Sequence, residues 1–204
     1  DTSDNLFIVD HQNHRIQKFS KDGKVIDSWG TFGHKEGQFN LPWGITVDKD
    51  DNVYVADWRN DRIQKLTSKG KHIATIGSSG SKEGQLNRPS SVAIDSEGNV
   101  FVADWGNERV QVFDSNGQFL LKLRGQATLS KWAQEFLDSN SDEAAARAKS
   151  NLEPKVNLLI NTPYAQSSYI EKYFWGPISV KIDSDDRLYV TESNRHRVQI
   201  YKKY

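Results

Sequence analysis

The chain alternates short runs rich in apolar residues with clusters of turn-forming residues, and this pattern predicts β-strands over most of its length. In one stretch the apolar runs lie at 44–48, 53–56, 62–66 and 72–76. Asp, Asn, Ser, Lys and Gly fill the intervals at 49–52 and 67–70, where they favour tight turns. Apolar and polar residues alternate in the run that begins at Arg62, as in a strand with one buried face. We therefore expect a four-stranded antiparallel unit here.

The same unit recurs along the chain. Arg15, Arg62 and Arg109 begin equivalent runs 47 residues apart, and Arg197 begins a fourth run 88 residues after Arg109. The 41 additional residues mark an insertion between the third and fourth copies. Four-stranded repeats of about 40–45 residues or slightly more are typical of propeller blades. We expect a single partial β-propeller over 1–204, with blades at about 1–32, 41–79, 88–125 and 174–204 and a mainly helical insertion at 126–173.

Three segments of the second copy carry a family resemblance. They are Pro42-Trp43-Gly44-Ile45-Thr46-Val47-Asp48, Val53-Tyr54-Val55-Ala56-Asp57 and Asn60-Asp61-Arg62-Ile63-Gln64-Lys65-Leu66. They resemble the NHL-repeat family of β-propellers, and the resemblance covers residues 1–125 and 174–204. The fourth copy departs from the pattern, with Glu192 in place of Asp and Arg195 in place of Asn.

The resemblance implies an all-β, six-bladed propeller of four-stranded antiparallel blades. It does not imply one function, because the family includes kinase sensor domains, RNA-binding domains, amidating lyases and many bacterial proteins. A bacterial source is the expectation, although the residues leave organism and compartment open. Six blades at this period would need about 282 residues besides the insertion. Further chain segments, or association of copies, are therefore expected to complete the ring.

An acidic residue ends the second strand of each copy and an arginine begins the third. Such a pair can form charge-assisted hydrogen bonds across the loop between the strands. Because the pair recurs in every copy, we interpret it as part of the scaffold. The pairs are Asp10 with Arg15, Asp57 with Arg62, Asp104 with Arg109, and Glu192 with Arg197.

The loops between second and third strands are the predicted binding face. Connections in an antiparallel meander alternate between the two ends of the sheet, so these loops share one end with the blade-to-blade connections and the insertion. Loops on a rigid scaffold commonly carry binding residues. Residues that differ between copies are the candidates for function: His11, His14, Trp58, Arg59, Asp61, Trp105, Glu108, Arg195 and His196, with Trp132 from the insertion.

Two groups of these candidates have more than one interpretation. Trp58 and Trp105 occupy equivalent positions and could pack between blades or anchor a peptide, sugar or partner loop. His14, Asp61, Glu108 and His196 share another repeat position and could converge on a metal, or lie off the axis.

The insertion predicts two helices. Leu129, Trp132, Ala133, Phe136 and Leu137 are spaced as on one face of an amphipathic helix, and Ser141-Asp142-Glu143 opens a second run that continues to Lys149. A short apolar piece at 158–160 and an aromatic-rich return at 164–175 follow. The helices could pack Trp132 and Phe136 onto the propeller, or form a lid, a wall of a ligand site or an oligomer surface.

Composition narrows the functional classes. The chain has 27 Lys+Arg, 27 Asp+Glu and no Cys, which removes disulfides and thiol chemistry. Acids and bases also balance on the predicted binding face, which disfavours RNA binding. No apolar run approaches the length of a membrane span.

No nucleophile elbow, phosphate loop or His-Glu-x-x-His motif is present, so we lean against an enzyme and expect no cofactor. The leading hypothesis is a non-catalytic scaffold that binds a protein or peptide through the loop-and-insertion face. The alternative is a metal-assisted lyase or hydrolase with an axial site, and an RNA-binding module ranks below both. A small-molecule ligand stays open, and nucleic acid is a disfavoured partner.

Overall fold

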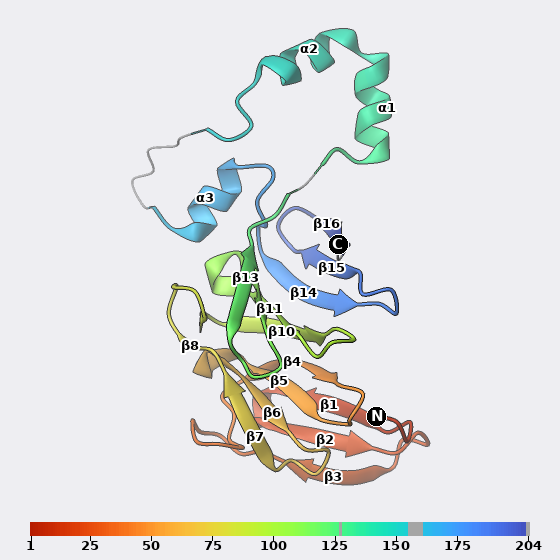
Figure 1. Ribbon diagram of the computed structural model, residues 1–204, viewed down its shortest axis with the longest axis vertical. Helices are drawn as coiled ribbons and strands as arrows, with labels where there is room; N and C mark the ends of the chain where they lie inside the picture. The colour runs from red at the N-terminus through yellow and green to blue at the C-terminus, as the bar shows by residue number, and fades with distance from the viewer. Residues whose placement is uncertain (127, 155–160, 203–204) are drawn as a thin grey trace.

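Four antiparallel sheets and a helical insertion make up the computed structural model, which describes residues 1–126, 128–154 and 161–202 (Figure 1). The sheets follow one another along the long axis of the molecule in chain order. The predicted all-β propeller architecture with a helical insertion is confirmed. The apolar piece predicted at 158–160 lies outside the described residues.

Each sheet is a meander whose strands pair in sequence order. The first contains β1 (Leu6–Asp10), β2 (Arg15–Phe19) and β3 (Val25–Trp29). The second contains β4 (Pro42–Val47), β5 (Val53–Asp57), β6 (Arg62–Leu66) and β7 (His72–Ile76). The third contains β10 (Pro89–Ile94), β11 (Val100–Asp104), β12 (Arg109–Phe113) and β13 (Phe119–Leu123). The fourth contains β14 (Pro177–Ile182), β15 (Leu188–Glu192) and β16 (Arg197–Tyr201).

Short elements join these strands at one end of the sheets. Three single-turn helices connect second to third strands: η1 (His11–Asn13), η2 (Trp58–Asn60) and η3 (Trp105–Asn107). A small parallel pair, β8 (Ser78–Ser79) with β9 (Gln85–Leu86), stabilises the connection from the second to the third blade. The sequence pattern did not predict this pair, because two-residue strands carry no periodicity.

The hydrophobic core lies between neighbouring sheets. Strand β10 contacts both β4 and β14, so the first strands of successive blades lie side by side, as around a propeller axis. One apolar cluster, which includes Tyr54 and Phe113, joins the second and third blades. Another, which includes Phe174 and Val190, joins the third and fourth. Each sheet thus buries its apolar side chains against the next one.

The insertion leaves and re-enters the propeller at one point. The Phe174 N–H donates to the Arg124 carbonyl at 2.7 Å, which brings the two ends of the insertion together. Gly125 is required there, because a Cβ would lie 2.4 Å from the Lys172 carbonyl oxygen and φ is +99°.

The insertion contains three helices, α1 (Lys131–Ser139), α2 (Ser141–Lys149) and α3 (Pro163–Tyr169). Helices α1 and α2 were predicted, and they stand away from the blades (Figure 1). Helix α3 was missed, although Thr162 as its cap and Pro163 at its first turn are start signals. None of the helices in the described residues is both long and apolar enough to cross a bilayer.

Candidate binding face

The strand register places the predicted loops at one end of the blades. In the second blade Pro42 and Arg62 both pair with Asp57, and Ile63 pairs with Ile76. The start of the first strand, the second-to-third loop and the end of the fourth strand therefore meet at the same edge. We call the corresponding surface of all four blades the loop face. It comprises η1, η2, η3, the turn at 193–196, the blade-to-blade connections and, from the insertion, α3 alone, because α1 and α2 stand away from the blades (Figure 1).

The recurring acid–arginine pairs hold this edge together. Asp57 is fully buried, and its carboxylate accepts from Arg62 Nε at 2.8 Å, Asn60 Nδ2 at 2.9 Å and Gln64 Nε2 at 3.1 Å. It also accepts the backbone N–H of Asn40, at 2.7 Å, from the preceding connection. In the second, third and fourth blades the acidic residue thus joins its loop to the connection that precedes the blade. The other pairs are also in contact: Arg15 with Asp10, Arg109 with Asp104, and Arg197 with Glu192.

The residue just before the third strand joins each blade to the next. His14 Nδ1 accepts the Leu41 N–H at 3.0 Å, Asp61 accepts the Arg88 N–H at 2.7 Å, and Glu108 accepts the Gly176 N–H at 2.5 Å. The three acceptors occupy one repeat position, and the three donors occupy another. His196 holds the same position as these acceptors in the fourth blade and is exposed. In this geometry His14, Asp61 and Glu108 each form a hydrogen bond to the next blade, and the three side chains do not converge on one metal position.

Trp58 lies in a cluster of aromatic and cationic groups. Its ring centroid is 5.5 Å from that of Trp43 and 6.4 Å from that of His11, and His11 lies 5.4 Å from Trp43. The guanidinium groups of Arg59 and Arg88 lie 4.8 Å and 5.4 Å from the Trp58 ring. Trp43 is 46% exposed, so the cluster is open to solvent. Cation–π contacts of this kind fix the orientation of the ring at the surface.

The aromatic surface continues into the third blade as a cavity of about 360 Å³. Its walls include the side chains of Trp105 and of Tyr164, which α3 contributes by packing against η3. Arg88 and Glu108 line it as well. Arg88 therefore borders both the Trp58 cluster and this cavity, so the two features are continuous.

Glu108 is only 2% exposed, and it is one of the residues that line the cavity. Burial raises the pKa of Glu108 to about 7, with a smaller upward contribution from the nearby charge of Glu192. The Gly176 N–H and the charge of Arg124 act in the opposite direction. The cavity thus contains a carboxyl group that changes charge near neutral pH.

The fourth blade replaces one repeat residue to hold the insertion. In the second and third blades, Asn60 and Asn107 donate to backbone carbonyls of the preceding connection. Arg195 stands in their place and donates through Nη2 to the carbonyls of Ser167 at 2.6 Å and Ile170 at 3.0 Å, at the end of α3. Its guanidinium also lies 5.5 Å from the Trp175 ring, which contacts Tyr164 at 5.6 Å.

These contacts bring most of the predicted binding residues into one surface, but not all of them. His11, Trp58, Arg59, Trp105, Glu108 and Arg195 are joined through it. Trp132 is 82% exposed in α1, and Phe136 is 56% exposed, so neither side chain packs onto a blade as one interpretation of the insertion required. Whether any of these residues binds a partner stays a prediction.

Sequence reasoning did not select four contributors to this surface: Trp43, Arg88, Tyr164 and Trp175. Trp43 follows the proline that begins its blade, where the other copies have Ser90 and Ile178. That difference between copies was an available signal. The contribution of Tyr164 depends on α3, which the sequence pattern did not predict.

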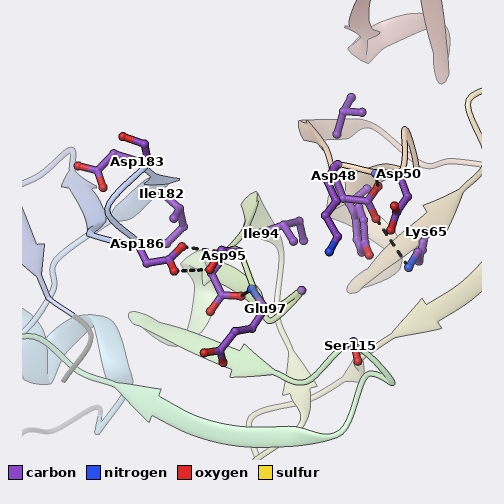
Figure 2. Close-up of a pocket in the computed structure, with 16 residues that line it drawn as sticks. Asp48, Asp50, Lys65, Ile94, Asp95, Glu97, Ser115, Ile182, Asp183 and Asp186 are labelled. Atoms are coloured by element: carbon purple, nitrogen blue, oxygen red, sulfur yellow. Dashed lines mark hydrogen bonds and ion pairs between the residues drawn. The ribbon is translucent and has the colours of Figure 1, made fainter. Parts of the chain in front are cut away.

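The opposite face has a second cavity, of about 470 Å³, at the turns between first and second strands (Figure 2). Hydrogen bonds link neighbouring turns of this face. The Thr2 N–H and hydroxyl donate to Asp51 at 2.8 and 2.7 Å, and Ser96 makes the equivalent two bonds to Asp186. Between the second and third blades the equivalent residues are Lys49 and Gly98, which cannot form this link, and both line the cavity.

Carboxylates line much of this second cavity, among them Asp48, Asp95 and Asp183 (Figure 2). Each of the three caps its own turn: Asp48 accepts from Asn52 N, Asp95 from Asn99 N and Asp183 from Arg187 N. Within the described part of the chain, no group of three or more His, Asp or Glu side chains is arranged to hold a metal ion.

Comparison with known proteins agrees with this architecture. The family model for the NHL repeat matches residues 39–66, 86–113 and 174–201. A search of curated proteins finds no significant match to the sequence.

Solved structures match at low identity. A catalytically inactive virginiamycin B lyase from Staphylococcus aureus with quinupristin is 14% identical, with a TM-score of 0.53 over 98% of this chain and 53% of that one. A structural genomics protein of unknown function from Bacteroides thetaiotaomicron is 17% identical, with a TM-score of 0.61 over 99% and 45%. A chain of the nidogen/laminin complex is 16% identical, with a TM-score of 0.60 over 98% and 56%. This chain therefore spans about half the length of the structures that it matches.

Proposed function

Because this chain belongs to the NHL-repeat family of β-propeller proteins, we propose that it is a non-catalytic scaffold that binds a protein or peptide through the loop face. The observation that carries the proposal is the continuous aromatic and arginine surface from His11 to Trp175. Isolated exposed apolar residues need no explanation on a soluble protein. A contiguous aromatic patch with arginine around it has the composition of protein-binding hot spots.

The design of the blades supports this assignment. The recurring residues of the loop face are used for hydrogen bonds within and between blades, as at Asp57 and Arg62. The aromatic and cationic residues vary from blade to blade: the position after the second strand holds His11, Trp58, Trp105 and Ser193. A constant scaffold with variable surface residues is the arrangement expected when specificity resides in loops.

The comparisons are compatible with this function without deciding it. One similar structure belongs to a complex of two proteins, nidogen and laminin. The similarity to the lyase is one of fold at 14% identity, and it brings no activity to this chain.

The proposal is tested by selecting peptides from a random display library against the whole chain and measuring their dissociation constants. We expect Trp58→Ala to weaken binding at least tenfold, because the substitution removes the centre of the surface. Two variants outside the loop face are matched controls: Trp132→Ala, which removes an exposed tryptophan of α1, and Asp50→Ala at the opposite face. Failure to recover peptides, or equal affinity of Trp58→Ala and wild type, would contradict the proposal.

A further inference from the structure

The second and third blades differ in the side chains that cover their equivalent tryptophans, Trp58 and Trp105. Arg59 follows Trp58 and places its guanidinium 4.8 Å from that ring. Gly106 follows Trp105 at the same repeat position, so the third blade has no side chain to do this. Among the described residues, no cation lies over the Trp105 ring. The cavity of about 360 Å³ lies at this place, bordered by Trp105 and Gly106.

Gly106 is also needed for the local packing. A Cβ on Gly106 would lie 2.6 Å from Cγ of Asn87, and the Gly106 N–H donates to the Asn87 carbonyl at 2.9 Å. The absence of a side chain therefore both admits the close approach of Asn87 and leaves the face of Trp105 uncovered.

Glu108, one of the residues that line the cavity, uses only one of its two carboxyl oxygens in a hydrogen bond with the described residues. One oxygen of Glu108 accepts the Gly176 N–H. No donor among the described residues lies within hydrogen-bond distance of the other oxygen. A buried carboxylate with an unused oxygen favours a cation that brings its own donors.

The arginines near the cavity make contacts with groups other than Glu108, and the Nε of Arg124 is buried without a hydrogen-bond partner among the described residues. The Arg124 guanidinium lies 4.7 Å from the Tyr173 ring, and its Nη2 is 3.5 Å from the Gln166 side-chain oxygen. The Arg88 guanidinium lies over Trp58. Their charges reduce the attraction for a further cation, but neither forms a hydrogen bond with Glu108 in the described part of the chain.

From these observations we propose that the cavity binds the guanidinium group of an arginine side chain from a protein partner. The group lies against Trp105 as Arg59 lies against Trp58, with Tyr164 opposite, and it donates to Glu108. A planar guanidinium suits this place because it can stack on an aromatic face while it hydrogen-bonds at its edge. The inference rests on the proposed function only in assigning the arginine to a protein partner.

The test uses a small probe, so it does not depend on knowing the partner. The whole chain is labelled with 5-fluorotryptophan, and its six tryptophans are followed by fluorine NMR during titration with N-acetyl-arginine amide. The Trp105 signal is identified as the one that Trp105→Phe removes. N-acetyl-citrulline amide, which has the same shape without the charge, is the control probe. We expect a saturable shift of the Trp105 signal with the arginine probe and little or none with citrulline.

Variants then locate the interaction. Glu108→Gln keeps an oxygen for the Gly176 N–H but removes the charge, and Tyr164→Ala alters a side chain that is 51% exposed. Each is expected to weaken binding at least about fivefold. Asp50→Asn removes a carboxylate charge at the opposite face and is expected to leave binding unchanged.

The inference is overturned by an unmoved Trp105 signal, by equal shifts with both probes, or by wild-type affinity in Glu108→Gln. These outcomes are separable from those for the proposed function. If selected peptides bind the loop face but the Trp105 signal does not respond to the arginine probe, only this inference is overturned. A Trp105 response to the probe, in a chain from which no peptide can be selected, supports this inference and contradicts the proposed function.

Discussion

At the scale of single residues, burial decides how much each recurring acid–arginine pair contributes to the stability of the fold. Asp104 is fully buried and accepts from Asn87 N, Asn107 Nδ2, Arg109 Nε and Gln111 Nε2, at 2.7 to 3.1 Å. Asp10 occupies the same position in the first blade, but its side chain is 19% exposed and that of its partner Arg15 is 42% exposed. The same two residue types therefore form a buried pair in one blade and a surface pair in another.

We predict that Asp104→Ala lowers the free energy of unfolding by about 3–5 kcal/mol, because it leaves Arg109 buried without its partner. Asp10→Ala should lower the free energy of unfolding by much less, because solvent screens an ion pair at the surface. Urea denaturation of both variants measures the difference. Equal losses would mean that burial does not govern the strength of these pairs.

Glu108 predicts a pH dependence of stability. Its pKa rises from an ordinary value of 4.5 to about 7 on folding, so the folded chain binds more protons between these two pH values. The contribution of this residue to stability therefore falls as pH rises through that window and is constant above it. Because Glu108 borders an open cavity, where solvent screens its charge, we expect its contribution to the free energy of unfolding to change by about 2 kcal/mol across this window.

Glu108→Gln should remove this dependence. Relative to wild type, the variant should gain about 2 kcal/mol in unfolding free energy between pH 4 and pH 8. Denaturant titrations at several pH values measure this difference in unfolding free energy. The other carboxyl groups are common to both proteins, so their contributions cancel in the comparison. Parallel pH profiles for the two proteins would show that Glu108 titrates normally.

At the scale of elements, the insertion explains one of the two departures of the fourth copy. Glu192 accepts the Trp175 N–H in the same way that Asp57 and Asp104 accept the equivalent N–H groups of their blades, so nothing in the structure explains the longer side chain. Arg195 replaces Asn where the preceding connection is the insertion, and it reaches the end of α3. The sequence showed both departures, but it could not show the role of Arg195, because α3 has no long amphipathic pattern and only short-range start signals.

We predict that Arg195→Ala releases α3 from the propeller. Two hydrogen bonds to the carbonyls of Ser167 and Ile170 are lost, so the amide hydrogens of α3 residues 164–169 should exchange at least tenfold faster. His196→Ala alters the exposed neighbour and should leave exchange in α3 unchanged. Unchanged exchange in Arg195→Ala would show that other contacts hold the helix.

At the scale of the whole molecule, repetition made most of the fold predictable. The spacing of Arg15, Arg62 and Arg109 defined the blades, and strand alternation placed the loops on one face. Contacts between blades were not predictable in the same way. The Trp58 cluster depends on Trp43 from β4 and on Arg88 from the connection that precedes β10, and only the assembled sheets bring them together.

The interrupted link on the opposite face gives a prediction about how blades join. Lys49→Ser together with Gly98→Asp would recreate the bonds that Thr2–Asp51 and Ser96–Asp186 form. Gly98 has a φ of +88°, so an Asp there is strained, although the equivalent Asp51 and Asp186 adopt φ of 60° and 54° and a Cβ on Gly98 would meet only Ser115, at 3.6 Å. The strain is present in the single variant as well, and it therefore cancels in the cycle. We expect a favourable coupling of about 0.5–1.5 kcal/mol in a double-mutant cycle.

The two single variants are the controls, since neither can form the link alone. Denaturation of all four proteins gives the coupling energy. A coupling indistinguishable from zero would mean that the second and third blades are held too far apart for the link.

The central claim, that the loop face binds a protein or peptide, is tested most directly by the hydrogen-exchange footprint of a selected peptide on the whole chain. We expect slower exchange in η2, η3 and α3, around Trp58 and Trp105, with no change in the turns at 48–52, 95–99 and 183–187 of the opposite face. Protection confined to those turns, or to α1 and α2, would contradict the claim.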